Sequence, residues 1–355
     1  MEAAAHAQAH AARPRVLAPL WAVAAGALLV LAVGAGVAFG PADIGLADLL
    51  RSVGAKLHLP GVNSPLAPTD ETILWELRLP RVVLGLLVGG MLGLAGATYQ
   101  GVFRNPLADP YLLGVAAGAG LGATLAIVYL PHAAAGHDLL PPAAFAGASV
   151  AVGLSYLVGR SVGRERDAAT LVLAGVTVAS FLTALQTFVQ QQHADTLQEV
   201  YSWILGRLSS SGWGDVTLIL PYVAVAVAAI LALRRSVDVF TLGDEEAASL
   251  GVDVARTRLV LVVAATVGTA AVVSVSGLIA FVGIIVPHAI RLLTGAGYRA
   301  LLPLSLVAGG AFLVLADLVA RTALSPAELP IGIVTAFVGA PFFAVVLRTA
   351  RTGAA

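Results

Sequence analysis

A row of hydroxyl and amide side chains interrupts one of the hydrophobic stretches of the chain. Its members are spaced three or four residues apart, which places them on one helical face: Thr177, Ser180, Thr183, Thr187 and Gln190. Gln186 and Gln191 widen this face near one end. Polar groups at membrane depth are costly unless they are hydrogen-bonded or wet. The row predicts either interhelical hydrogen bonds or the water-facing wall of a pathway for a large polar ligand, and the clustered glutamines favour the wall.

A second group of chemically active side chains is acidic and occupies residues 244–246, within a polar connection. Gly243 breaks the preceding chain, Asp244 is a good N-cap, and carboxylates favour the positive end of a helix dipole. Gly251 is placed to end the helix, and Leu250 contributes to a small apolar edge. The pattern predicts a short amphipathic helix, which is either an ordinary surface helix or a docking element for a cytoplasmic partner.

The other reactive residue types form no catalytic or metal-binding pattern. The chain has no cysteine, which excludes disulfides, thiolate metal ligands and cysteine nucleophiles. Its seven histidines are scattered without a metal-ligand spacing, and no phosphate-binding loop of the G-x-x-x-x-G-K-S/T type occurs. Twenty basic residues balance twenty acidic ones, which disfavours a nucleic-acid partner. We therefore expect a non-catalytic chain with no cofactor and no metal site.

Asp317 is the only carboxylate deep within a hydrophobic stretch. An acid inside the membrane is a candidate functional group. Arg321 follows it by four residues, a spacing that permits an ion pair along a helix. The spacing and the position near a helix end favour a structural ion pair.

The composition indicates which elements hold these side chains. Hydrophobic residues make up 59% of the 355 residues and charged residues 11%, whereas soluble domains have about 25% charged residues. So little charge cannot cover a water-soluble fold, so we predict an all-α polytopic membrane protein. A spanning helix needs about 20 apolar residues. Eight stretches qualify: 16–39, 82–99, 111–130, 142–159, 168–189, 216–233, 300–320 and 331–347.

Residues 259–290 are too long for one span and too short for two full ones. As a single helix they would reach about 48 Å, against a hydrocarbon core of about 30 Å. We expect one full helix, a break near residues 274–277, and a short or broken helix near 276–290. With ten spans and both termini cytoplasmic, fourteen of the twenty Lys and Arg residues lie inside, in accord with the positive-inside rule. The prediction is a cytoplasmic tail at 1–14 and a single ten-span domain at 15–350.

Glycine recurs every fourth residue in two of the spans. The rows are Gly85, Gly89 and Gly93, and Gly114, Gly118 and Gly122. Small residues at this spacing let helix backbones approach closely. We interpret both rows as packing seams.

Several motifs, in order along residues 70–348, resemble the FecCD-type permeases. They are RLPR at 78–81, QGVFRNPLADP at 100–110, LGDEEAASLG at 242–251, GLIAFVGIIVPHAIR at 277–291, LPIGIVT at 329–335 and GAPFF at 339–343. These permeases are the membrane subunits of type II ATP-binding-cassette importers for iron–siderophores, haem and cobalamin. The resemblance implies that this chain moves such a compound inward across the cytoplasmic membrane of a prokaryote.

The resemblance also implies partners and roles. Two copies would pair around a central pathway, contacting membrane lipid, an ABC ATPase dimer inside and a substrate-binding protein outside. Residues 238–256 would form the coupling segment, with these ATPase contacts: Leu242, Gly243, Asp244, Glu245, Glu246, Ala248, Leu250 and Gly251. The turn at Asn105, Pro106 and Leu107 would form part of an inner gate. Basic residues outside would either dock the binding protein or anchor to lipid headgroups: Arg51, Lys56, Arg78, Arg81 and Arg207.

A different class of transporter remains possible from the residues alone. An ion-coupled secondary transporter of a polar metabolite would want inverted repeats and a buried coupling acid. The chain shows no convincing repeat, and Asp317 is the only deep carboxylate. The resemblance to the FecCD-type permeases implies that the binding protein outside holds most of the selectivity for the transported compound.

Overall fold

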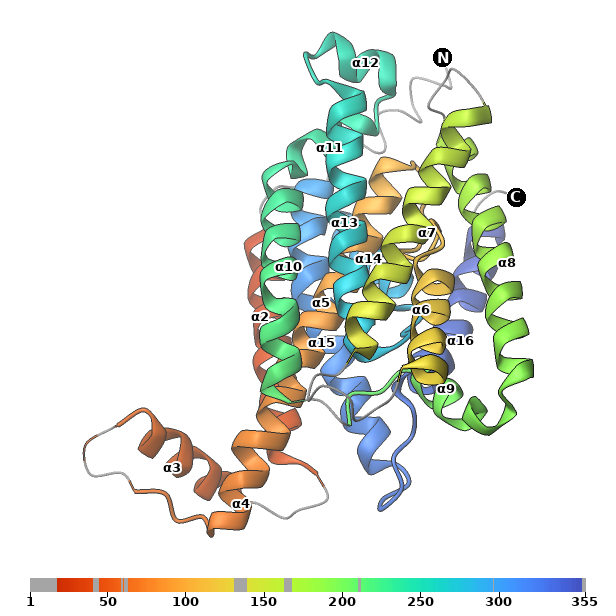
Figure 1. Cartoon of the computed structure of the whole chain (residues 1–355). Coiled ribbons are helices and arrows are strands. Elements are labelled where there is room, and N and C mark those ends of the chain that lie inside the picture. Colours follow the sequence, from red (N-terminus) through yellow and green to blue (C-terminus); the bar gives the residue numbers. More distant parts are fainter. Residues whose placement is uncertain are drawn as a thin grey trace.

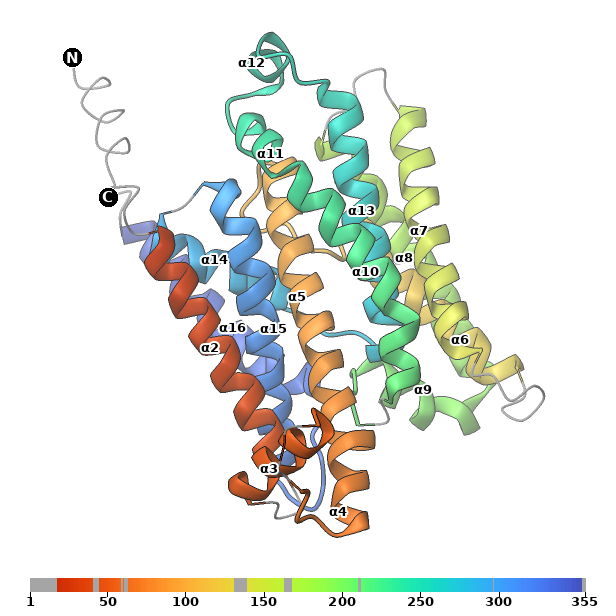
Figure 2. The same ribbon diagram turned by 90° about the vertical axis from the view of Figure 1, so that its left-hand side faces the viewer.

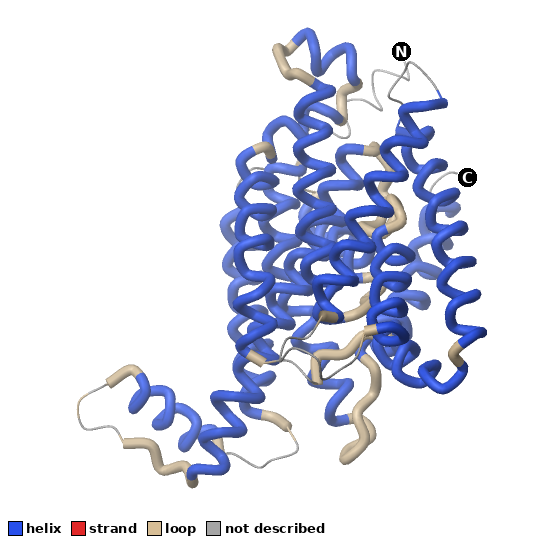
Figure 3. Tube along the Cα trace, viewed as in Figure 1, coloured by secondary structure: helices blue, strands red, loops and turns tan. Residues whose placement is uncertain are grey.

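A computed structural model describes residues 18–40, 45–58, 60, 63–130, 139–162, 168–209, 212–295 and 297–352. The predicted tail at 1–14 lies outside these residues. Within the described ranges the regular secondary structure consists of helices (Figure 3). The all-helical class predicted from composition is therefore confirmed.

Among the described residues, seven helices are long and apolar enough to cross a membrane. They are α2 (Ala18–Ala38), α5 (Leu79–Val102), α7 (Leu140–Val162), α8 (Ala168–Gln192), α10 (Trp213–Ala232), α13 (Val254–Ser276) and α15 (Tyr298–Thr322). Three further helices have shorter apolar stretches: α6 (Val115–Tyr129), α14 (Val282–Thr294) and α16 (Ile331–Thr352), whose apolar part is Ile331–Val346. All of these run roughly along one axis and form an elongated bundle (Figures 1 and 2). The polytopic membrane architecture follows from this arrangement.

The predicted break in the 259–290 stretch is present. Helix α13 ends at Ser276, Gly277 takes φ +70°, and α14 starts only at Val282. A side chain on Gly277 would collide with the carbonyl oxygen of Trp203. This position therefore requires glycine twice, for its left-handed backbone and for the close approach of α9 (Leu197–Ile204).

Helix α6 starts later than predicted. Residues 111–114 belong to a turn, because Gly114 has φ +82° and serves as the N-cap of α6 at Val115. The hydrophobic stretch at 111–130 conceals this boundary, since Tyr111, Leu112 and Leu113 are apolar but not helical. The result is a helix of 15 residues, which is short for a full span.

Both glycine rows form packing seams, as predicted, except that Gly114 precedes α6 and makes a left-handed turn instead. A methyl group on Gly89 or Gly93 of α5 would strike the backbone oxygen of Gly309 or Ser305 on α15. Gly118 and Gly122 of α6 face the backbone of α7 in the same way. Close backbone contact gives extensive van der Waals packing where no hydrophobic effect drives helices together.

Two small extramembrane structures stand at opposite ends of the bundle (Figures 1 and 2). At one end lie α3 (Leu46–Lys56) and α4 (Pro68–Thr72), and the π-helical η2 (Ile73–Arg78) joins α4 to α5. The Trp75 indole donates to the Ser52 hydroxyl at 3.3 Å, which holds α3 against η2. At the other end lie α11 (Arg234–Phe240) and α12 (Asp244–Ser249).

Candidate functional site

Helix α12 projects beyond the bundle on a turn that glycine makes possible (Figure 1). Gly243 has φ +120° and ψ 162°, a backbone region that is essentially restricted to glycine. Gly243 is therefore the N-cap, so the prediction of Asp244 in that position is wrong by one residue. Gly251, at φ +84°, follows the helix and its N–H donates to Ala248 O at 2.9 Å, as expected for a terminating glycine.

The Asp244 carboxylate holds α12 onto its surroundings. It accepts two hydrogen bonds from Arg258 Nη2 of α13, at 2.8 and 2.9 Å. Arg104 Nη2, in the turn between α5 and α6, lies 3.4 Å from the same carboxylate. These contacts connect α12 to α13 and to the 103–114 turn. The Asp244 carboxylate therefore holds α12 in position through contacts within its own chain.

The outer surface of the same segment carries both charge and apolar area. The side chains of Glu245 and Glu246 are exposed. Leu242 and Leu250 are 59% and 63% exposed, while Ala247 is fully buried beneath them. Two projecting leucines beside two free carboxylates form a surface that a partner could cover, and we call Leu242, Glu245, Glu246 and Leu250 the coupling face.

The 103–114 turn is rigid, as its prolines and Asx residues predict. Asn105 Oδ1 accepts from Leu107 N at 2.9 Å, and Asp109 Oδ1 accepts from Tyr111 N at 2.7 Å. Such side-chain-to-backbone bonds stabilise a fixed turn. Asn105, Pro106 and Leu107 are exposed at the same end of the bundle as α12.

The polar row on α8 is divided between two environments. Thr177, Ser180, Thr183 and Thr187 are exposed, and Gln191 shares their face. Gln186 and Gln190 are instead buried, at 8% and 9% exposure. Gln186 Nε2 donates to Thr124 Oγ1 of α6 at 3.1 Å. Three residues make less than one turn of a helix with 3.6 residues per turn, so each spacing of three rotates the next side chain around the helix. After three such spacings Gln190 lies on the side that faces the protein.

The five predicted outer basic residues also fall into different environments. Arg51 and Lys56 are exposed on α3, where the Lys56 ammonium lies 5.4 Å from the centroid of the Trp75 ring. Arg207 is half-buried and lines a cavity of about 150 Å³ together with Arg81.

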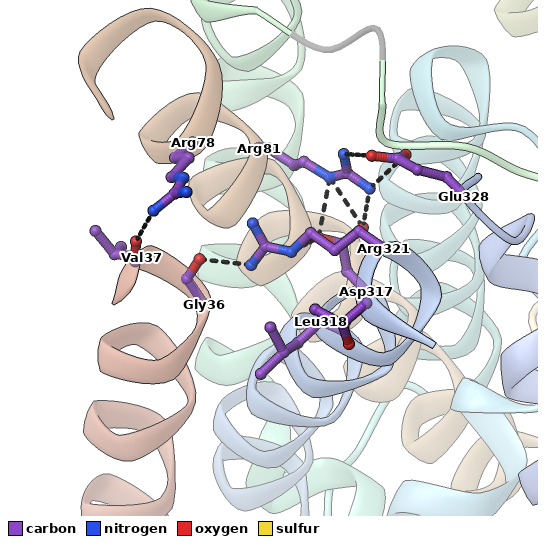
Figure 4. Close-up of polar contacts among 9 residues, drawn as sticks. Gly36, Val37, Arg78, Arg81, Asp317, Leu318, Arg321 and Glu328 are labelled. Carbon is purple, nitrogen blue, oxygen red and sulfur yellow. Dashed lines mark hydrogen bonds and ion pairs between the residues drawn. The ribbon is translucent and has the colours of Figure 1, made fainter. Parts of the chain in front are cut away.

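Arg78 is 4% exposed, and its guanidinium is directed at the end of α2 (Figure 4). Arg78 Nη1 donates to the carbonyls of Val37 and Ala38 at 3.2 and 3.3 Å. Arg321 Nη2 donates to Gly36 O nearby. The last carbonyls of a helix lack internal partners and carry the negative end of its dipole. The two arginines thus cap α2 from η2 and α15.

Arg81 lies at the centre of an ionic network that joins α5, α15 and the segment before α16 (Figure 4). Its Nε and Nη2 donate to the Asp317 carboxylate at 2.8–3.0 Å, and Nη1 and Nη2 donate to Glu328 at 3.0 and 3.1 Å. Arg321 Nε lies 3.6 Å from Asp317 Oδ2, which confirms the predicted helix ion pair. The link from Arg81 to Asp317 crosses 236 residues and has no local sequence signal.

The sequence pattern of the FecCD transport family matches residues 28–349. The chain therefore belongs to the FecCD transport family. A cobalamin import system permease, BtuC of Halobacterium salinarum, is 42% identical over 92% of this chain and 95% of its own length. The ferric enterobactin permease FepD of Escherichia coli is 37% identical over 86% of this chain and 90% of its own length.

A solved structure has the same fold as this FecCD member. It is described as an inward-facing conformation of a metal-chelate type ABC transporter. The two superpose with a TM-score of 0.80 at 29% identity, covering 93% of this chain and 99% of that one. The chain is thus a permease subunit of the ABC-importer type that resides in the membrane, as its motifs implied.

Proposed function

We propose that this chain moves an iron chelate, haem or a corrinoid inward across the cytoplasmic membrane, driven by a separate ATPase. The observation that carries the proposal is the family match along residues 28–349, with relatives named for cobalamin and ferric enterobactin. The chain supplies the pathway and performs no chemistry on the transported compound. It works with an ABC ATPase dimer inside and a substrate-binding protein outside.

The membrane topology in this proposal has ten spans and both termini in the cytoplasm. Within the part of the chain that the structure describes, seven long apolar helices and three helices with shorter apolar stretches support the count. The distribution of Lys and Arg supports the orientation, with the α12 end inside and the α3 end outside.

Cysteine labelling tests this orientation directly, because the chain has no cysteine of its own. We expect a membrane-impermeant maleimide to label Arg51→Cys on α3 in intact spheroplasts. Ser249→Cys on α12 should be labelled only after the membrane is permeabilised. Both positions are exposed, so burial cannot explain a difference. Labelling of Ser249→Cys from outside would contradict the topology.

The coupling face is the proposed contact with the ATPase. Leu242 and Leu250 flank the projecting helix α12 and are exposed, so together they provide apolar area that a cleft can bury. Asp244, Arg258 and Arg104 hold α12 in place beneath this surface. Gly243, Ala248 and Gly251 shape the segment without themselves supplying a charged contact.

The exposed hydroxyl face of α8 is proposed to line the pathway, facing that of a second copy. Thr177, Ser180 and Thr187 donate to carbonyls of their own helix at 2.9–3.0 Å, so they present oxygen acceptors outward. Gln191 extends this face, while Gln186 bonds α8 to α6 of its own subunit and Gln190 is buried. The rigid turn at Asn105, Pro106 and Leu107 suits an inner gate beside the coupling segment.

Docking of the binding protein is proposed at Arg51 and Lys56, which are exposed on α3. Arg207 supplements them from the cavity that it shares with Arg81. Arg78 and Arg81 are proposed to support this docking surface indirectly. Their guanidinium groups already bind Val37 O of α2 and Asp317 of α15, so they hold helix ends together within the chain.

Transport by the purified assembly tests the function. The chain, co-purified with its ATPase and binding protein, is reconstituted into liposomes and offered labelled cyanocobalamin or ferric enterobactin. We expect uptake of one of these classes to require ATP on the ATPase side. Uptake that persists without the ATPase and collapses with the proton gradient would instead identify an ion-coupled secondary transporter.

A further inference from the structure

The first turn of α15 is capped by a residue from another helix. Its own N-cap, Gly297, has no side chain to satisfy the free N–H groups. Asp238 of α11 supplies both missing acceptors: Oδ1 accepts from Tyr298 N, and Oδ2 accepts from Arg299 N at 3.1 Å. A carboxylate at a helix N-terminus makes charge-assisted hydrogen bonds and meets the positive end of the dipole. Asp238 therefore bonds α11 firmly to the start of α15.

Two glycines make room for this contact. A methyl group on Gly297 would lie 2.9 Å from Asp238 Oδ1, although its φ of −68° suits any residue. A methyl group on Gly101, near the end of α5, would collide with Val237 of α11 and approach the Tyr298 ring. Helix α11 consequently packs against both α5 and α15 (Figure 2).

Tyr298 extends the connection to α14. Its hydroxyl accepts from Arg291 Nη2 at 3.1 Å, and the guanidinium lies 5.3 Å from its ring centroid. Arg291 Nη2 also donates to Gln100 Oε1 at 3.1 Å, and Gln100 Nε2 donates to Gly283 O at 3.2 Å. Gly283 belongs to the first turn of α14, next to the break at 277–281. A continuous set of contacts thus runs from α11 to both ends of α14.

We propose that Asp238 is a positioning residue that transmits movement of the coupling segment to α15 and α14. The proposal rests on the coupling role given to α12 above. Without Asp238, α11 would move with α12 while the first turn of α15 stayed in place, because the bonds from Asp238 to Tyr298 N and Arg299 N would be missing. With it, α11 and the first turn of α15 move together, and Tyr298 and Arg291 carry the displacement into α14. We call Asp238, Tyr298, Arg291 and Gln100 the relay.

Spin labels on the cysteine-free chain test the relay in the complete complex with its ATPase. A single nitroxide at Ser249→Cys reports the distance between the α12 helices of the two copies. A nitroxide at Leu293→Cys, which is 62% exposed, reports the distance between the α14 helices. Trapping with ATP and vanadate is expected to shift both distances in the otherwise unchanged chain. Asp238→Ala is expected to retain the Ser249 shift and to lose the Leu293 shift.

Asp253→Ala is the matched control, because Asp253 also caps a helix at this end of the bundle. Its Oδ1 accepts from Arg256 N at 3.0 Å, in the first turn of α13, the helix that directly follows Asp253. Both alanine variants lose a helix cap. If Asp238 had a merely structural role, the two variants would lose similar thermal stability and both would keep the Ser249 and Leu293 distance shifts. We expect Asp253→Ala to keep both shifts. Asp238→Asn, which retains an acceptor oxygen, should keep most of the Leu293 shift.

One further variant and two outcomes distinguish failure of the relay from failure of the coupling role of α12. Tyr298→Phe keeps the ring and the backbone N–H, so it should reduce the Leu293 shift while leaving the Ser249 shift intact. A Leu293 shift that survives in Asp238→Ala would overturn the relay and leave the coupling role standing. Absence of the Ser249 shift in the otherwise unchanged chain would overturn the coupling role and the relay with it.

Discussion

Asp317→Ala is expected to lower the free energy of unfolding by about 3–5 kcal/mol, because removing one partner of a buried ion pair leaves an uncompensated charge. Asp317 is 2% exposed and Arg321 3%. Arg81 would lose three hydrogen bonds, and the ion pair to Arg321 would disappear. Unfolding by SDS in mixed micelles measures the change.

Glu328→Ala is the control for this prediction. Its carboxylate binds the same arginine, but its side chain is 33% exposed, so water can replace the lost contact. We expect it to cost less than about 1 kcal/mol, as for other exposed pairs. Equal losses for Asp317→Ala and Glu328→Ala would show that the network does not depend on burial.

The double substitution Leu242→Asp and Leu250→Asp is expected to weaken binding of the ATPase about a hundredfold. Two leucines buried at an interface contribute about 3 kcal/mol together, and a hundredfold change corresponds to about 2.8 kcal/mol. Both side chains are exposed in the single chain, so the fold itself should be unaffected. Titration of the reconstituted chain with its purified ATPase measures the affinity.

Leu57→Asp provides the comparison at the other end of the molecule. Leu57 follows α3 and is 68% exposed, similar to Leu250. We expect this variant to bind the ATPase as tightly as the unchanged chain. If Leu57→Asp weakened binding to the same degree, the loss would reflect a general effect of added charge, and the coupling face would not be the contact.

Much of the arrangement of helices could be predicted from the sequence, because the length of a hydrophobic stretch and the spacing of glycines are visible in contiguous residues. The 259–290 stretch could not fit one span or two, and the structure breaks it at Gly277. The glycine rows predicted close seams, and both seams are present. The start of α6 was missed because apolar side chains do not show that Gly114 turns the backbone.

The candidate site was less predictable, because it depends on which residues meet across the bundle. A basic residue near a helix end looks the same in sequence whether it faces solvent, as Arg51 does, or caps another helix, as Arg78 does. The polar row on α8 showed a shared face but not which neighbour covered its edge. Asp238 lies 60 residues before Tyr298, whose backbone N–H donates to its carboxylate, and no spacing rule reaches that far.

The glycine seams also constrain how this chain can change over evolutionary time. A position that is exposed on the single chain, such as Phe337 at 76%, can exchange one apolar side chain for another at little cost to its folding. At Gly89 and Gly309 each backbone blocks the other's missing side chain, so a substitution on one helix has no compensating substitution on the other. Descendants of this sequence should therefore diverge first on their outer faces and retain glycine at both positions long after the surrounding residues have been replaced.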